Sequence, residues 1–151
     1  MNVLSVKDIK RISSNYKSKG LKIVFTNGCF DLLHKGHLDL LKKSSKYGDI
    51  LIVGLNSDSS VKKLKGASRP VEDEMIRSQK LMSINYIDHV IIFKQLTPKK
   101  LISELKPDVL VKGGDYELNK IVGADEVVSN GGIVKVIPLT PGFSTTSIIE
   151  K

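Results

Sequence analysis

The sequence predicts an α/β fold in which five parallel strands form one open sheet with helices on both faces. Two observations support this prediction. Five short apolar runs are rich in β-branched residues and are continuous rather than alternating, as in strands that are buried on both faces. Segments with helical spacing separate these runs, which is the order that parallel strands require. The predicted strands are residues 23–25, 50–55, 90–93, 109–111 and 133–137.

Helices are predicted before and between these strands, and several of them carry end signals. Thr97 followed by Pro98 is typical of a helix start. Gly48 and the pair Gly131-Gly132 stand where helices are expected to end. The predicted helices are residues 6–18, 37–47, 72–84, 98–105 and 124–129.

The length and composition are those of a single domain. With 151 residues and 40% hydrophobic content, the chain is long enough to bury one core. No repeat, linker or low-complexity tract interrupts it. We therefore expect one Rossmann-like domain over residues 1–151, with residues 1–20 as a helical extension and residues 21–151 as its core.

Composition also limits the compartment and the partners. The single cysteine, Cys29, excludes an internal disulfide framework, and no apolar run approaches the roughly 18 residues of a membrane span. The N-terminus lacks the apolar region of a signal peptide, so we expect a cytoplasmic protein with no membrane partner. The net charge of +8 attracts anions such as nucleotides and sugar phosphates. Nucleic acid is not expected, because no aromatic and basic residues interleave along a strand.

Four segments that break the helix and strand rhythm follow the ends of predicted strands. They are residues 26–37, 56–70, 112–116 and 138–147. In an open parallel sheet the carboxyl ends of the strands lie along one edge, where ligands bind. These segments therefore predict a ligand site at that edge.

The first of these segments has the features of a phosphate site. It passes from a strand end through a glycine turn into a helix, where free N–H groups and the helix dipole favour an anion. His34 and His37 are three residues apart on one side of the helix start, and each can donate to phosphate oxygens. The alternatives are a histidine that only caps the helix, and a zinc site. Zinc is disfavoured because His89 is the only other histidine and Cys29 the only cysteine.

Two segments resemble the signatures of one family. His34-Lys35-Gly36-His37 resembles the His-x-Gly-His signature of the cytidylyltransferase-like nucleotidyltransferases. Residues 142–149 resemble their second signature, a Ser-Thr-Thr run that opens a helix. The two segments occur in the family's order, and the resemblance spans residues 21–151.

Within this family, residues 56–58, 64–70 and 111–116 resemble the adenylyltransferase domains of ADP-heptose synthases. The resemblance implies transfer of AMP from ATP to D-glycero-β-D-manno-heptose 1-phosphate, which yields ADP-heptose for lipopolysaccharide or a related heptose glycoconjugate. It also implies Mg²⁺ that is held mostly by phosphate oxygens and water. Relatives are often fused behind a sugar kinase and often form dimers, so the resemblance leaves a stand-alone enzyme and a homodimer as expectations.

The same resemblance assigns roles to individual residues. His34 and His37 would contact the nucleotide phosphates and stabilise the transition state, and Arg77 would also reach a phosphate. Lys65 would bind substrate, although Lys62 and Lys63 are close enough to leave that choice open. The remaining nucleotide-binding positions belong to the glycine turn, the nucleoside pocket and the second signature: Asn27, Gly28, Cys29, Phe30, Gly36, Lys112, Gly114, Asp115, Ser144, Thr145 and Thr146.

The sequence departs from the family pattern in two places. Cys29 stands where many relatives have threonine, and Leu139-Thr140-Pro141 stand where one branch has an arginine. Lys112 is our candidate for the cation that replaces it. We predict no protein ligand for a metal, with Asp31 as the conceivable exception.

The expected mechanism is direct in-line attack of the sugar phosphate on the α-phosphorus of ATP, without a covalent enzyme intermediate or a general base. Two alternatives stay open. The first is a cytidylyltransferase that acts on glycerol 3-phosphate or another alcohol phosphate. The second is a non-catalytic module that binds nucleotides or nucleic acid.

Overall fold

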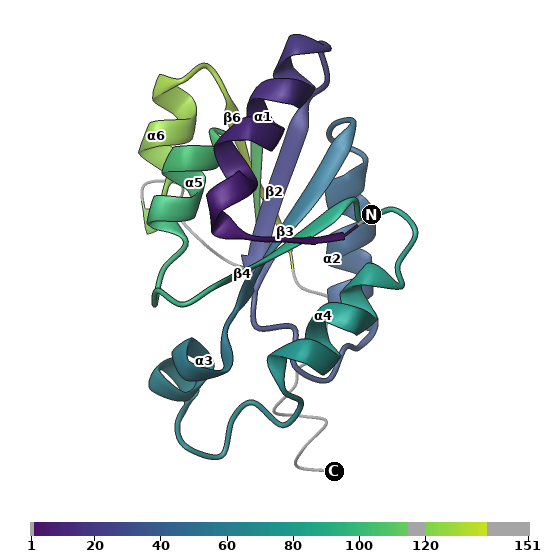
Figure 1. Cartoon of the computed structure of the whole chain (residues 1–151), viewed down its shortest axis with the longest axis vertical. Coiled ribbons are helices and arrows are strands. Elements are labelled where there is room, and N and C mark those ends of the chain that lie inside the picture. Colours follow the sequence, from purple (N-terminus) through teal and green to yellow (C-terminus); the bar gives the residue numbers. More distant parts are fainter. Residues whose placement is uncertain (1, 115–119, 139–151) are drawn as a thin grey trace.

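The computed structural model describes residues 2–114 and 120–138. Six strands form one sheet in the order β1-β4-β3-β2-β5-β6, and every neighbouring pair is parallel (Figure 1). Helices cover both faces of this sheet, so the predicted open α/β architecture is confirmed. The strands are β1 (Asn2–Leu4), β2 (Ile23–Gly28), β3 (Ile50–Asn56), β4 (His89–Phe93), β5 (Val109–Gly113) and β6 (Ile133–Ile137).

All five predicted strands are present, as β2 to β6. The sixth strand, β1, was missed by the prediction. It has three residues and pairs with β4 at the sheet edge, where Leu4 lies opposite Ile91. The segment before residue 21 is therefore not purely helical, because this strand precedes its helix. A run of three residues is too short to show a period, so its pairing depends on β4 rather than on a local pattern.

The helices observed agree with the predicted ones to within a few residues, apart from one addition. α3 was expected to be loop, because its eight residues contain only two apolar side chains, Val61 and Leu64. The Gly131-Gly132 pair ends α6 as predicted, whereas Pro98 rather than Thr97 is the N-cap of α5. The helices are α1 (Ile9–Ser18), α2 (Lys35–Ser45), α3 (Asp58–Lys65), α4 (Glu74–Met82), α5 (Lys99–Leu105) and α6 (Ala124–Ser129), with a 3₁₀ turn at Val6–Asp8 before α1.

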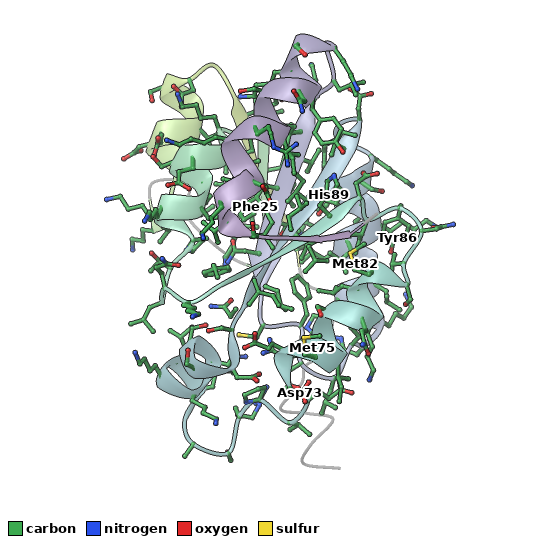
Figure 2. All side chains as sticks on the ribbon, viewed as in Figure 1. Phe25, Asp73, Met75, Met82, Tyr86 and His89 are labelled. Atoms are coloured by element: carbon green, nitrogen blue, oxygen red, sulfur yellow. The ribbon has the colours of Figure 1, made fainter. Side chains whose placement is uncertain are left out.

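The sheet separates two apolar clusters. Successive side chains of a strand point to opposite faces, so Phe25 of β2 packs with α1, α5 and α6, while its neighbour Val24 packs with α2 and α4. Along α4, Met82 packs against the second cluster, whereas Met75 is exposed (Figure 2). No helix among the residues described is long and apolar enough to cross a membrane.

Candidate functional site

Two adjoining cavities lie at the carboxyl ends of β2, β3 and β5. Their volumes are about 500 and 130 Å³. Three of the four segments predicted to meet at this edge contribute lining residues to them. The fourth, residues 138–147, lies outside the described residues except for Pro138. Both cavities are lined by Asn27, Gly28, Cys29, Lys65 and Lys112.

The structure brings seven of the eleven predicted site residues that it describes to these cavities. His37 and Phe30 line the smaller one. His34 and Gly36 line neither cavity and lie at the start of α2. Gly114 follows β5 and donates its N–H to the carbonyl oxygen of Ile137. Asp115, Ser144, Thr145 and Thr146 lie outside the described residues, so their predicted roles are untested.

The two signature histidines cap the first turn of α2. The backbone N–H of Gly36 donates to Nδ1 of His34 at 3.1 Å, and the N–H of His34 donates to Nδ1 of His37 at 3.3 Å. The first N–H groups of a helix have no partner within the helix, so these bonds satisfy donors that are otherwise unpaired. Since each Nδ1 accepts a hydrogen bond, a neutral ring carries its proton on Nε2. The N–H at Nε2 of His37 is therefore the donor that its ring can offer at the smaller cavity.

Both imidazoles are held in their neutral form. Burial, assisted by the nearby His34 and Lys65, lowers the pKa of His37 to about 4. Burial also lowers the pKa of His34. At neutral pH the pair can thus donate hydrogen bonds without carrying charge.

The glycine turn before α2 is shaped by Phe30. A Cβ atom added to Gly28 would lie 3.1 Å from Cε2 of Phe30, which is tighter than an ordinary contact. The Phe30 ring in turn meets the His37 ring edge-on, with centroids 5.4 Å apart. Glycine at position 28 is needed because the aromatic ring fills the space that a side chain would take.

Lysine side chains make the shared wall of the cavities positive. Lys65 ends α3, and Lys112 lies on β5 and is partly buried. Burial lowers the pKa of Lys112, an effect that Cys29 opposes. Lys62 and Lys63 line neither cavity, so the geometry favours Lys65 among the three lysines that the sequence left open.

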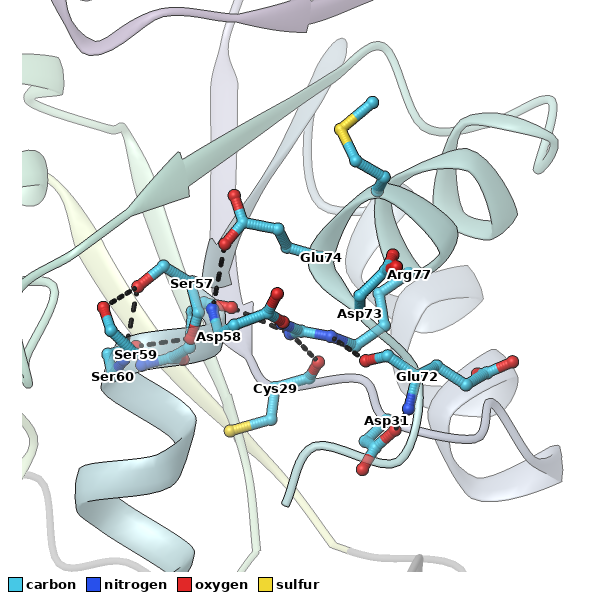
Figure 3. A network of polar contacts seen from close by, with 12 residues as sticks. Cys29, Asp31, Ser57, Asp58, Ser59, Ser60, Glu72, Asp73, Glu74 and Arg77 are labelled. Atoms are coloured by element: carbon cyan, nitrogen blue, oxygen red, sulfur yellow. Dashed lines mark hydrogen bonds and ion pairs between the residues drawn. The ribbon is translucent and has the colours of Figure 1, made fainter. Parts of the chain in front are cut away.

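Arg77 differs from the sequence prediction. Its side chain is fully buried and lines neither cavity. Nε donates to the carbonyl oxygen of Glu72 at 2.9 Å, and Nη1 donates to those of Cys29 and Asn56, both at 2.8 Å. Nη2 forms an ion pair with Asp58 at 2.7 Å (Figure 3). The guanidinium therefore joins three chain segments at the carboxyl edge of the sheet, at Cys29, residues 56–58 and Glu72, and each of its nitrogens bonds to a protein atom.

The Cys29 thiol is protonated at neutral pH. Burial raises its pKa, although Lys65 and Arg77 pull in the other direction. A neutral thiol is a weak nucleophile, in line with a pocket-lining role.

The family can now be stated, because its sequence model, described as cytidylyltransferase-like, matches residues 25–151. This chain belongs to the cytidylyltransferase-like family. The membership that the two signature segments predicted is thereby confirmed, and with it the general class of nucleotidyltransferase.

Curated relatives of this cytidylyltransferase-like chain are much longer proteins. The bifunctional protein HldE of Geobacter metallireducens is 55% identical over 135 residues, which are 89% of this chain and 28% of that protein. The HldE of a Marinomonas species is 52% identical over 149 residues, 99% of this chain and 31% of the relative. The chain thus spans less than a third of the length of these relatives.

Solved structures share the fold of the cytidylyltransferase-like chain. A lipopolysaccharide core biosynthesis protein from Thermoplasma volcanium is 31% identical and superposes with a TM-score of 0.63, covering 80% of this chain and 98% of that protein. The pantoate-β-alanine ligase of Francisella tularensis superposes with a TM-score of 0.64 over 91% of this chain and 66% of the ligase, at 18% identity. The second likeness is one of fold alone.

Several lining residues were missed by the sequence analysis. Leu96 and Thr97 line the larger cavity and lie shortly after β4. The sequence analysis had not included the segment after this strand in the site. Lys120 lines the same cavity. The position of Leu96 and Thr97 shortly after a strand was a usable signal, whereas Lys120 had none.

Proposed function

We propose that this chain is the adenylyltransferase that joins AMP from ATP to D-glycero-β-D-manno-heptose 1-phosphate, releasing pyrophosphate and forming ADP-heptose for lipopolysaccharide or a related glycoconjugate. The observation that carries the proposal is the histidine-capped start of α2 beside two joined cavities. The likeness to the HldE proteins and to a lipopolysaccharide core biosynthesis protein supports heptose as the sugar. We also propose that the reaction takes place in the cytoplasm and that this chain forms a homodimer.

The two substrates meet at the wall that the cavities share. A cavity of about 500 Å³ is within the usual range for a small-molecule ligand, and the smaller one of about 130 Å³ suits a phosphate group. His37, Lys65 and Lys112 all line the smaller cavity. Phosphates placed there receive the Nε2–H of His37 and the positive charge of two lysines.

The transfer is one in-line displacement. An oxygen of the sugar phosphate attacks the α-phosphorus of ATP, the new P–O bond forms, and the electron pair of the breaking P–O bond leaves with pyrophosphate. The attacking phosphate is already ionised at neutral pH, so no base has to remove a proton. Preorganised N–H donors lower the barrier where negative charge builds up on the phosphorus oxygens.

Mg²⁺ enters with the phosphates of ATP in this proposal. Among the residues described, no group of three or more His, Cys, Asp or Glu side chains could hold a metal ion. The side chains that line the smaller cavity include two lysines, whose cationic nitrogens do not bind Mg²⁺, and one carboxylate, Asp31. The ion neutralises phosphate charge, while the protein aligns the reactants.

A panel of nucleoside triphosphates and acceptors, followed by pyrophosphate release, tests the proposal. We expect the highest kcat/KM with ATP and heptose 1-phosphate. The His34→Ala/His37→Ala double variant, purified in the same way, gives the background from contaminating enzymes. A higher kcat/KM with CTP and glycerol 3-phosphate would replace the proposal by the cytidylyl alternative, and release at background level with every pair would leave a binding module.

A further inference from the structure

The carboxylate of Asp31, in the turn before α2, accepts three hydrogen bonds from the protein. Its side chain is 1% exposed. Oδ2 accepts hydrogen bonds from the N–H of Val71 at 2.8 Å and from Nε of Arg69 at 3.1 Å. Oδ1 accepts the N–H of Glu72 at 3.0 Å, and Figure 3 shows Asp31 beside Glu72. In return, the N–H of Leu32 donates to Oε1 of Glu72 at 3.2 Å. The turn and the segment before α4 therefore hold each other from both sides.

The backbone on either side of Asp31 is strained. Phe30 and Leu32 have φ angles of 47° and 54°, in the left-handed region that side chains other than glycine rarely adopt. Such a conformation persists only where surrounding contacts impose it. The bonds of Asp31 and Glu72 impose this conformation here. They hold Asp31, which lies between the two strained residues, and the N–H of Leu32.

The strain has a consequence for the signature histidine. The left-handed turn at Phe30 directs its ring into the space beside Gly28 and against the edge of the His37 imidazole. The Phe30 side chain is 3% exposed, so the ring has little freedom to move. The position of His37 in the smaller cavity is thereby linked to the backbone that Asp31 holds.

We propose that Asp31 is a positioning residue for the transfer reaction: anchored by Arg69 and residues 71–72, it holds the turn at Phe30 and thereby places His37 against the phosphates. The inference rests on the proposed function. Asp31 lines the smaller cavity, but its side chain is 1% exposed and both carboxylate oxygens already accept hydrogen bonds from the protein, which favours a positioning role over that of a metal ligand or a base.

Two further observations agree with this role. Burial would raise the pKa of Asp31, but the backbone N–H groups of Val71 and Glu72 and the Arg69 guanidinium outweigh it, so the pKa is lowered and the charge is kept. Arg69 is 11% exposed, and its Nη2 is buried with no hydrogen-bond partner among the described residues. Arg69 is thus oriented for Asp31 although another of its donors is left unpaired.

The test compares Asp31→Asn with Asp108→Asn. Asp108 makes the same kind of bond, accepting the N–H of Ile23 at 2.8 Å, but at the opposite end of β2. Misplacement of a reacting group by about 1 Å can cost on the order of 100-fold in rate, so Asp31→Asn should lower kcat by at least about tenfold. KM for ATP and the Mg²⁺ concentration for half-maximal rate should change little. Asp108→Asn should lower the melting temperature without this loss of kcat.

Arg69→Gln and Phe30→Leu approach the same linkage from other residues. Both substitutions should lower kcat. The loss of kcat in the double variant Asp31→Asn/Arg69→Gln, expressed as a free energy, should be smaller than the sum of the two single losses. These variants keep the test open if Asp31→Asn folds poorly. The inference is overturned if folded Asp31→Asn or Arg69→Gln has the kcat of Asp108→Asn, or if Asp31→Asn requires at least about tenfold more Mg²⁺, which is the behaviour of a metal ligand.

A measurement on the imidazole separates this inference from the proposed function. The ring signals of His37 in an NMR titration should shift, and its pKa should change, in Asp31→Asn but not in Asp108→Asn. If no acceptor supports pyrophosphate release with the unmodified chain, the proposed function fails while this comparison still decides the positioning role. Unchanged His37 signals in Asp31→Asn would reject it.

Discussion

The imidazole rings of His34 and His37 are stacked at an interplanar angle of 21°, with centroids 3.8 Å apart. Two positive rings at this distance would repel each other. Protonation of either ring at Nδ1 would also displace the backbone N–H that it accepts at the start of α2. The signature histidines are therefore neutral in the resting protein, and under the proposed function we expect N–H donation rather than positive charge to act on a phosphate.

Loss of one such donor should slow turnover more than it weakens ATP binding. His37→Ala should lower kcat by about 100- to 1,000-fold, or roughly 3 to 4 kcal/mol, because the donor acts where charge develops. His37→Asn keeps an N–H donor that carries no charge, so its kcat should lie between wild type and His37→Ala. Turnover, ATP affinity and melting temperature measured on both variants provide the check.

The competing interpretation is that His37 only caps the helix. It predicts a stability loss of about 1 kcal/mol and almost normal turnover in the folded molecules. A His37→Ala protein with a lower melting temperature and nearly wild-type kcat would support that interpretation and remove the main argument for a catalytic histidine.

Stability should depend on the protonation of His37. The pKa of His37 is about 4 in the folded protein against 6.5 for the ordinary value, so between these values the unfolded chain binds more protons. The free energy of unfolding contributed by this group is complete above pH 6.5 and is lost as pH falls towards 4. A single group of this kind changes stability by up to about 1.4 kcal/mol per pH unit.

Urea unfolding at several pH values between 4.5 and 7.5 measures this dependence. We expect a smaller slope in His37→Asn than in wild type, since asparagine does not titrate. Equal slopes in the two proteins would show that other groups govern the acid limb.

Lys65 and Lys62 form a matched pair on α3. Lys65 lines both cavities, whereas Lys62 lines neither. Lys65→Met should lower kcat/KM by at least about tenfold, because a lysine facing a phosphate contributes a charge-assisted hydrogen bond of roughly 1.5 to 3 kcal/mol. Lys62→Met should remain close to wild type. A larger loss of kcat/KM in Lys62→Met than in Lys65→Met would mean that a different face of α3 contacts the bound substrates.

The success of the sequence analysis followed the length and regularity of each element. Strands β2 to β6 are continuous β-branched runs, which few other structures require, and they were all identified. β1 has only three residues, which is too short for a period to emerge, and α3 has only two apolar side chains, so neither carries a local pattern. The structure places His37 and Lys112 at the smaller cavity as expected, because His37 belongs to a motif in the segment after β2 and Lys112 lies near the end of β5.

The direction of a side chain was the harder part. Arg77 was expected to reach a phosphate, yet it is four residues before the buried Leu81 and therefore on the inward face of α4. That spacing was a usable signal for its burial. The bonds between Asp31 and the segment at residues 69–72 carried no local signal, since the partners are about forty positions apart.

Arg77 gives the sharpest contrast between a structural and a phosphate-binding side chain. Arg77→Lys keeps one positive charge but cannot donate in four directions, and it leaves carbonyl oxygens of Cys29, Asn56 or Glu72 without partners. Each unpaired buried acceptor costs about 1 to 3 kcal/mol, so the free energy of unfolding should fall by roughly 3 to 5 kcal/mol. Arg11→Lys is a suitable control, because Arg11 forms an exposed ion pair with Asp8 on the N-terminal segment.

Urea unfolding and ATP saturation curves on the same Arg77→Lys preparation separate the two roles. If Arg77 holds the carboxyl edge together, Arg77→Lys should strongly lower the free energy of unfolding. In molecules that remain folded, kcat should also fall, because the turn at Cys29 loses a hydrogen bond that orders it. A residue that contacts phosphate should instead raise KM for ATP with little change in the urea midpoint. Since all three nitrogens of the Arg77 guanidinium bond to protein atoms, we expect the first result, and a stable Arg77→Lys protein with weakened ATP binding would contradict it.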